Sequence, residues 1–100
     1  MTDDRFLAAA EREFARAADR YQREQPGLGD VFDAVKEAAE RAVMYPERGN
    51  PYFFGTRRII LSRFPYSLVY VVRPIRTVIV AVAHQRRRTG YWRKRLRSIH

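Results

Sequence analysis

The chain has 100 residues, 46% of them hydrophobic and 13% aromatic, with a formal net charge of +9. This length suits one domain around one hydrophobic core, so we expect residues 1–100 to form a single domain. Because the chain contains no cysteine, a disulfide framework and a thiolate metal site are excluded, and we expect a reducing, cytoplasmic environment, no cofactor and no metal. No apolar run approaches the roughly 18 residues of a membrane span, so we expect no membrane partner.

The charge is distributed unevenly between the two halves of the chain. Residues 1–50 carry eight basic and eleven acidic side chains, whereas residues 51–100 carry twelve basic and no acidic ones. A cationic surface of this kind attracts polyanions at long range. The second half therefore predicts nucleic acid, a nucleoprotein such as the ribosome, or an acidic protein as a partner.

Two amphipathic helices are predicted in the first half. Apolar residues recur at three- and four-residue spacings from Leu7 to Tyr21, and Pro26 and Gly27 should end this helix near Gln25. A second apolar stripe covers residues 28–43, and Tyr45-Pro46 should close it. Helices joined by so short a turn form an antiparallel hairpin.

Strands are predicted in the second half of the chain, after a loop that runs to Gly55. Three segments are rich in β-branched and aromatic residues, namely residues 58–62, 66–73 and 77–84. Pro74 suits a hairpin turn over residues 73–76. The last segment is apolar on both faces, so we expect it at the centre of the sheet. An N-terminal edge strand just before Leu7 would be a fourth strand.

This order of elements predicts an α+β domain. We expect an N-terminal antiparallel helical hairpin packed on a three- to four-stranded antiparallel sheet, followed by a basic C-terminal tail over residues 85–97. Tyr66 and Tyr70 share one face of the sheet, and their bulk predicts core positions.

The chain contains no familiar catalytic signature, such as a glycine-rich phosphate loop or a metal-ligand spacing. His84 ends the last predicted strand, just before Arg86 to Arg88. A side chain at this position can contact a ligand, or it can simply form a hydrogen bond at the edge of the sheet. Tyr91 and Trp92 follow these cations, and aromatic rings interleaved with cations are typical of surfaces that grip phosphates and bases. The alternative is that both rings pack back onto the sheet.

Together these elements resemble the RelE/ParE toxin superfamily over nearly the whole chain. The matching stretches are residues 10–14, Tyr21, residues 26–29, Phe32, and residues 45–48, 57–58, 64–70, 81–84, 86–88 and 90–93. The resemblance implies the toxin of a type II toxin-antitoxin pair. It also implies a cognate antitoxin, whose disordered C-terminal segment wraps the helical hairpin and the sheet.

Members of this superfamily act on different targets. RelE-like toxins cut mRNA in the ribosomal A site, which would give Arg58, Arg86 and Tyr91 roles in phosphate binding and proton transfer. ParE-like toxins block DNA gyrase without being enzymes. Ile60 and Ser67 stand where RelE-type toxins place a lysine and an arginine, and a site that works by electrostatic stabilisation loses two cations there.

We therefore favour a ParE-like toxin that inhibits DNA gyrase. The alternative is a RelE-like, ribosome-dependent mRNA endoribonuclease that needs no metal, and the third hypothesis is a non-toxic basic nucleic-acid-binding module. The expected partners are the cognate antitoxin, in a hetero-oligomer, and either gyrase or the ribosome with its mRNA. The predicted target-binding residues are Arg58, Arg63, His84, Arg86, Arg87, Arg88, Tyr91 and Trp92.

Overall fold

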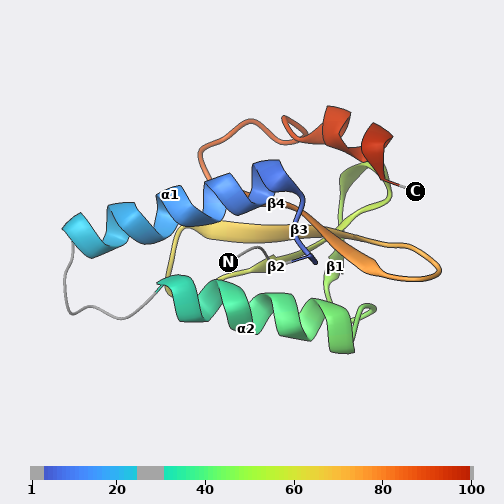
Figure 1. Ribbon diagram of the computed structural model, residues 1–100, viewed down its shortest axis with the longest axis horizontal. Helices are drawn as coiled ribbons and strands as arrows, with labels where there is room; N and C mark the ends of the chain where they lie inside the picture. Colours follow the sequence, from blue (N-terminus) through green and yellow to red (C-terminus); the bar gives the residue numbers. More distant parts are fainter. Residues whose placement is uncertain (1–3, 25–30, 100) are drawn as a thin grey trace.

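A computed structural model describes residues 4–24 and 31–99 and shows two helices followed by a four-stranded sheet (Figure 1). Helix α1 spans Ala8–Glu24, helix α2 spans Val31–Met44, and the two run in opposite directions. The predicted α+β class and helical hairpin are confirmed. The turn predicted at Pro26 and Gly27, and the first turn of the second helix, lie outside the described residues.

The strands form an antiparallel sheet in the order β1-β2-β3-β4. Their bounds are Asn50–Pro51 for β1, Arg57–Ile60 for β2, Tyr66–Val72 for β3 and Thr77–His84 for β4. The last three match the predicted segments within two residues. The backbone N–H of Arg73 donates to the carbonyl of Arg76 at 2.9 Å, which confirms the hairpin turn. Strand β1, by contrast, lies in the stretch that we predicted to be loop.

The prediction that residues 77–84 lie at the centre of the sheet is wrong. Strand β4 ends the strand order, and beyond it the described chain adds one parallel bridge between Phe6 and Ile79. The backbone of Ile79 accepts from Leu7 at 3.0 Å and donates to Arg5 at 2.7 Å. The expected N-terminal edge strand is thus reduced to a single bridge. Strand β4 is apolar on both faces because each face is covered by another part of the chain.

Each face of the sheet carries its own hydrophobic core. On one face, Leu68 and Tyr70 pack with apolar residues of α1 and α2. On the other, Val69 and Val78 pack against Trp92 and Ile99. Burial confirms the predicted core positions of Tyr66 and Tyr70. The first face is hereafter called the helix face. The second is called the strap face, after the C-terminal strap described next.

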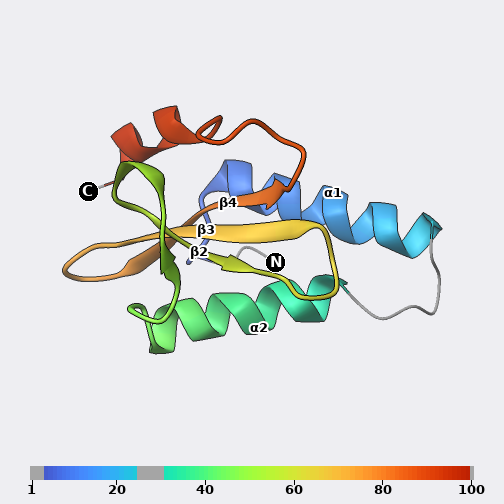
Figure 2. The same cartoon turned by 180° about the vertical axis from the view of Figure 1, so that it is seen from behind.

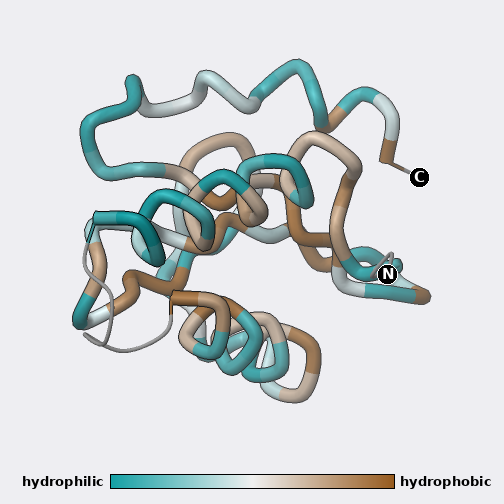
Figure 3. The backbone as a smooth tube through the Cα atoms, turned by 60° about the vertical axis from the view of Figure 1, so that its left-hand side comes forward, coloured by the Kyte–Doolittle hydropathy of each residue, from teal (hydrophilic) through white to brown (hydrophobic). Residues whose placement is uncertain are grey.

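The C-terminal segment, residues 85–99, is a strap that folds back on the sheet and contains the short 3₁₀ helix η2 (Arg93–Ser98). Figures 1 and 2 show it returning along the α1 side of the molecule, away from α2. It is largely hydrophilic, with brown strands beneath it (Figure 3). The predicted basic tail is therefore a packed layer, because Trp92 and Ile99 anchor it in the core. In the described part of the chain, no helix is long and apolar enough to cross a membrane.

Candidate functional site: a cationic groove beside a buried carboxylate

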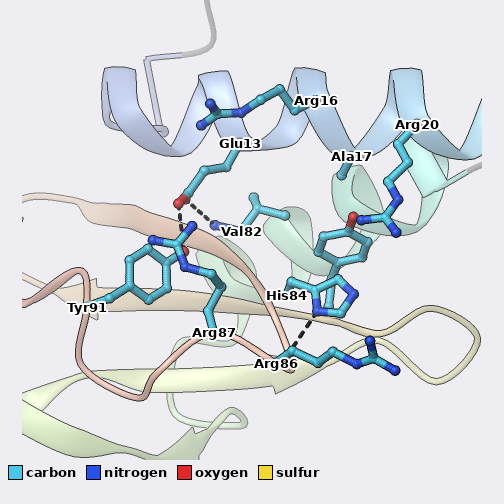
Figure 4. Close-up of a pocket in the computed structure, with 10 residues that line it drawn as sticks. Glu13, Arg16, Ala17, Arg20, Val82, His84, Arg86, Arg87 and Tyr91 are labelled. Carbon is cyan, nitrogen blue, oxygen red and sulfur yellow. Dashed lines mark hydrogen bonds between the residues drawn. The ribbon is translucent and has the colours of Figure 1, made fainter.

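A groove of about 610 Å³ runs between α1 and the segment that follows β4 (Figure 4). Arg16 and Arg20 line it from α1, and Arg86 and Arg87 line it from the start of the strap. We call this the cationic groove. These four guanidinium groups give the groove a positive charge that would attract an anionic group.

Glu13 lies at one end of the groove and is only 8% exposed. Its carboxylate accepts a hydrogen bond from the backbone N–H of Val82 at 3.1 Å and one from the hydroxyl of Tyr91 at 2.6 Å (Figure 4). The guanidinium of Arg95 donates to both of its oxygens, at 2.9 and 3.0 Å. A buried carboxylate needs this many donors, since otherwise its desolvation would not be offset. The Glu13 cluster therefore ties α1, β4 and the strap together.

Glu13 was not among the site residues predicted from the sequence, although its spacing on α1 carried a signal. Ala10 and Ala17, three residues before and four residues after it, are both fully or almost fully buried. This spacing puts all three side chains on one side of α1. A carboxylate on an apolar stripe indicates a partner elsewhere in the fold.

Tyr91 is held in place by this cluster and by Arg87. The guanidinium of Arg87 lies 3.9 Å from the centre of the Tyr91 ring. Burial, and then the hydrogen bond to Glu13, raise the pKa of the Tyr91 hydroxyl well above its usual value. The hydroxyl is thus a donor committed to Glu13, which makes it a poor proton acceptor.

His84 lies in the same groove, at the end of β4. Its Nδ1 accepts a hydrogen bond from the backbone N–H of Arg86 at 3.1 Å, and its ring meets the Tyr66 ring edge to face at 5.1 Å. Partial burial, with further contributions from Arg20 and Arg86, lowers the pKa of His84 below the ordinary 6.5. Both observations favour the neutral imidazole at pH 7.

This lowered pKa can be measured by NMR titration of the His84 ring. We expect a midpoint below 6.5, and we expect Arg20→Gln to move the midpoint upward, because a neighbouring positive charge is removed. Arg12→Gln, which removes an exposed charge from the same helix, is the matched control. Since the unfolded chain binds the proton more readily, His84 should lower the stability of the fold as the pH falls below about 6.5. A midpoint at or above 6.5 would contradict this interpretation.

The structure brings together only half of the predicted target-binding residues. His84, Arg86, Arg87 and Tyr91 share the cationic groove. The others lie elsewhere. Arg58 lies beside Tyr52 and Arg63 beside Phe64, Arg88 is an exposed residue of the strap, and Trp92 is in the core.

The prediction that Trp92 contacts the target is corrected by its burial. Its side chain is 1% exposed and packs against the strap face of the sheet. A ring in that position has no surface left for a ligand. The alternative interpretation, in which the ring packs back onto the sheet, describes Trp92.

Strand register explains why Arg58 and His84 are separated. Arg58 is opposite Val69, whose side chain lies on the strap face, whereas His84 is opposite Tyr66, which lies on the helix face. Directly paired residues project from the same face of a sheet. Arg58 and His84 therefore point to opposite sides of it.

Together the fold and the groove define a small basic α+β domain with a cationic groove. Residues 5–89 match the family model described as the ParE toxin of the type II toxin-antitoxin system parDE. The chain therefore belongs to the ParE toxin family, and it is the toxin of a type II pair with a cognate antitoxin as partner.

A solved structure agrees with this assignment at the level of the fold. The chain is similar to one in the chromosomal ParDE TA system from P. aeruginosa, with a TM-score of 0.67 and 15% sequence identity. The similarity covers 79% of this chain and 90% of that one. No curated protein matches this chain.

Proposed function

We propose that this toxin arrests growth by inhibiting DNA gyrase. The proposal rests on the match of residues 5–89 to the ParE family. The superfamily resemblance described above links the ParE branch to gyrase and the RelE branch to mRNA. The branch to which the toxin belongs therefore determines its expected target.

The sheet lacks two of the cations that RelE-type toxins carry, because Ile60 and Ser67 stand at their positions. Ile60 is paired with Ser67, and Ser67 in turn with Ala83, so these three side chains form a row across the sheet. None of them is charged. Such a row cannot stabilise the negative charge that develops when a phosphodiester is cleaved.

The three residues proposed for RNA cleavage do not form one site. Arg86 and Tyr91 line the cationic groove, whereas Arg58 lines a separate depression beside α2 and β2. The Tyr91 hydroxyl donates to Glu13, and its raised pKa disfavours proton abstraction. A general base has to lie within hydrogen-bond reach of the proton that it takes. These observations support the ParE-like action over the nuclease.

A supercoiling assay with purified gyrase tests the proposal. We expect the toxin to inhibit supercoiling of relaxed plasmid in a dose-dependent way, and equimolar antitoxin to remove the inhibition. In a ribosome-containing translation extract, the same toxin should leave mRNA whole. Normal supercoiling together with ribosome-dependent mRNA cuts would overturn the proposal in favour of the RelE-like activity.

Among the described residues, part of the β2 edge is left open for the antitoxin. Strand β1 pairs only with Arg57 and Arg58, so it leaves Ile59 and Ile60 of β2 without a β1 partner. Arg41 and Arg48 lie beside this edge, in a depression of about 350 Å³. We infer that an acidic extended segment of the antitoxin adds a strand there, within a toxin-antitoxin hetero-oligomer. Light scattering on the co-purified pair measures the stoichiometry, and hydrogen exchange at Ile59 and Ile60 tests the contact.

A further inference from the structure

The loop between β1 and β2 presents two aromatic side chains to solvent. Phe53 is 56% exposed and Phe54 is 47% exposed. They belong to the one-turn 3₁₀ helix η1 (Phe53–Gly55), which lies beside the strap in Figures 1 and 2. Apolar rings of this size cost free energy when they are left in water, so their exposure calls for an explanation.

The backbone of this loop is strained at an aromatic residue. Phe54 has φ 62° and ψ 35°, the left-handed region that bulky residues rarely occupy, and Gly55 follows at φ 77°. Strain of this kind persists only where the surroundings impose it, and it is concentrated at functional sites. The strained backbone beside two exposed rings therefore points to a functional use for them.

Two sets of contacts hold the loop in this conformation. Buried Thr56 donates its hydroxyl to the carbonyl of Phe53 at 2.7 Å, and its own carbonyl accepts from the N–H of Tyr52 at 2.8 Å. The Phe54 ring is covered by Arg93 at 4.3 Å and meets Trp92 edge to face at 6.0 Å. The loop is therefore fixed before any partner arrives, which lowers the entropy cost of binding.

The surroundings of the two rings are cationic. The guanidinium carbon of Arg58 lies 4.3 Å from the centre of the Tyr52 ring, and that of Arg93 lies 4.3 Å from the centre of the Phe54 ring, so each cation stacks on an aromatic group. Next to Arg93, a hollow of about 460 Å³ is lined by Lys94, Leu96 and Arg97 as well. Among the described residues, no carboxylate lines this hollow or the depression at Arg58. We call Tyr52, Phe53, Phe54, Arg58 and Arg93 the aromatic platform.

We propose that the aromatic platform is the surface by which the toxin docks on an acidic protein target, with Phe53 inserted into a groove of that target. Exposed aromatic rings framed by arginines are the composition of binding hot spots between proteins. The guanidinium groups fit carboxylates of the partner. Single-stranded nucleic acid is bound in cationic grooves that follow its backbone, whereas Phe53 and Phe54 line neither the cationic groove, nor the depression at Arg58, nor the hollow beside Arg93. A protein is therefore the better match.

The proposal rests on the proposed function where it identifies the target as gyrase. It is tested with Phe53→Ala, because an exposed side chain can be removed without opening the core. The matched control is Ile75→Ala, which removes an apolar side chain that is 97% exposed in the turn between β3 and β4. Circular dichroism and the fluorescence of Trp92, the single tryptophan of the chain, confirm that the variants are folded.

We expect Phe53→Ala to weaken both gyrase binding and gyrase inhibition by about tenfold or more, as hot-spot residues do. Phe53→Glu should weaken them further, since it adds a negative charge facing an acidic partner. Arg93→Gln should weaken binding and reduce its dependence on salt. Ile75→Ala should bind and inhibit like the wild type, and antitoxin affinity should be the same for all four variants.

Several outcomes would overturn the docking proposal. One is a folded Phe53→Glu variant that inhibits gyrase as the wild type does. Another is a Phe53→Ala variant that loses affinity for single-stranded DNA or for the antitoxin while its gyrase binding is unchanged. If wild-type toxin leaves gyrase unaffected, the proposed function fails separately. Growth arrest in cells then tests the platform: a tenfold weaker arrest by Phe53→Ala supports it, and an equal arrest refutes it.

Discussion

Replacing Glu13 by alanine should lower the free energy of unfolding by about 3 kcal/mol, since breaking a largely buried ion pair strands its partner. The change removes the only carboxylate in contact with Arg95 among the described residues, and it leaves the hydroxyl of Tyr91 and the N–H of Val82 without their acceptor. Small domains are stable by only about 5 to 15 kcal/mol. This single change therefore removes a large share of the stability, and urea denaturation measures it.

The matched control is Glu24→Ala, which breaks an exposed ion pair with Arg20 on the same helix. Exposed pairs one turn apart contribute roughly 0.3 to 0.5 kcal/mol, so this variant should unfold almost as the wild type does. Glu13→Gln should fall between the two alanine variants, because the amide keeps an acceptor oxygen but loses the charge. Equal stability of Glu13→Ala and Glu24→Ala would show that the Glu13 cluster does not stabilise the fold.

The helices and strands β3 and β4 could be predicted because their patterns are long. Helix α1 repeats its apolar stripe over several turns, and β3 and β4 are seven and eight residues of β-forming sequence. Strand β1 has only two residues, one of them Pro51, and two residues show no periodicity. The sheet centre was misplaced for a different reason. An apolar strand sequence indicates that both faces of the strand are covered, but it does not show whether both of its edges are hydrogen-bonded to other strands.

The candidate site was harder to predict than the fold, because its residues meet only through tertiary structure. Glu13 and Arg95 are 82 positions apart, and no local pattern connects them. The run from Arg86 to Trp92 looked like one continuous surface in the sequence. In the structure, the strap turns over the edge of β4, so Arg87 faces the groove while Trp92 faces the core. Residue composition thus indicated a basic site, and strap packing decided which cations belong to it.

Replacing Trp92 by alanine should lower the free energy of unfolding by about 3 to 5 kcal/mol, the usual cost of removing a large buried ring. The side chain packs with Val69 and Val71 on the strap face, and its ring lies 6.0 Å from each of the Tyr52 and Phe54 rings. Its loss therefore leaves a cavity under the strap and removes a support of the aromatic platform. Urea denaturation followed by circular dichroism measures the change without needing tryptophan fluorescence.

Trp92→Phe separates this structural role from the direct target contact that the sequence suggested. Phenylalanine fills most of the space, so the variant should lose less stability than Trp92→Ala, and its folded molecules should inhibit gyrase as the wild type does. A residue that contacts the target behaves in the opposite way: its replacement weakens inhibition and leaves stability unchanged. A Trp92→Phe protein with wild-type stability and tenfold weaker inhibition would place this ring in the interface, and the strap would then have to open when the toxin binds its target.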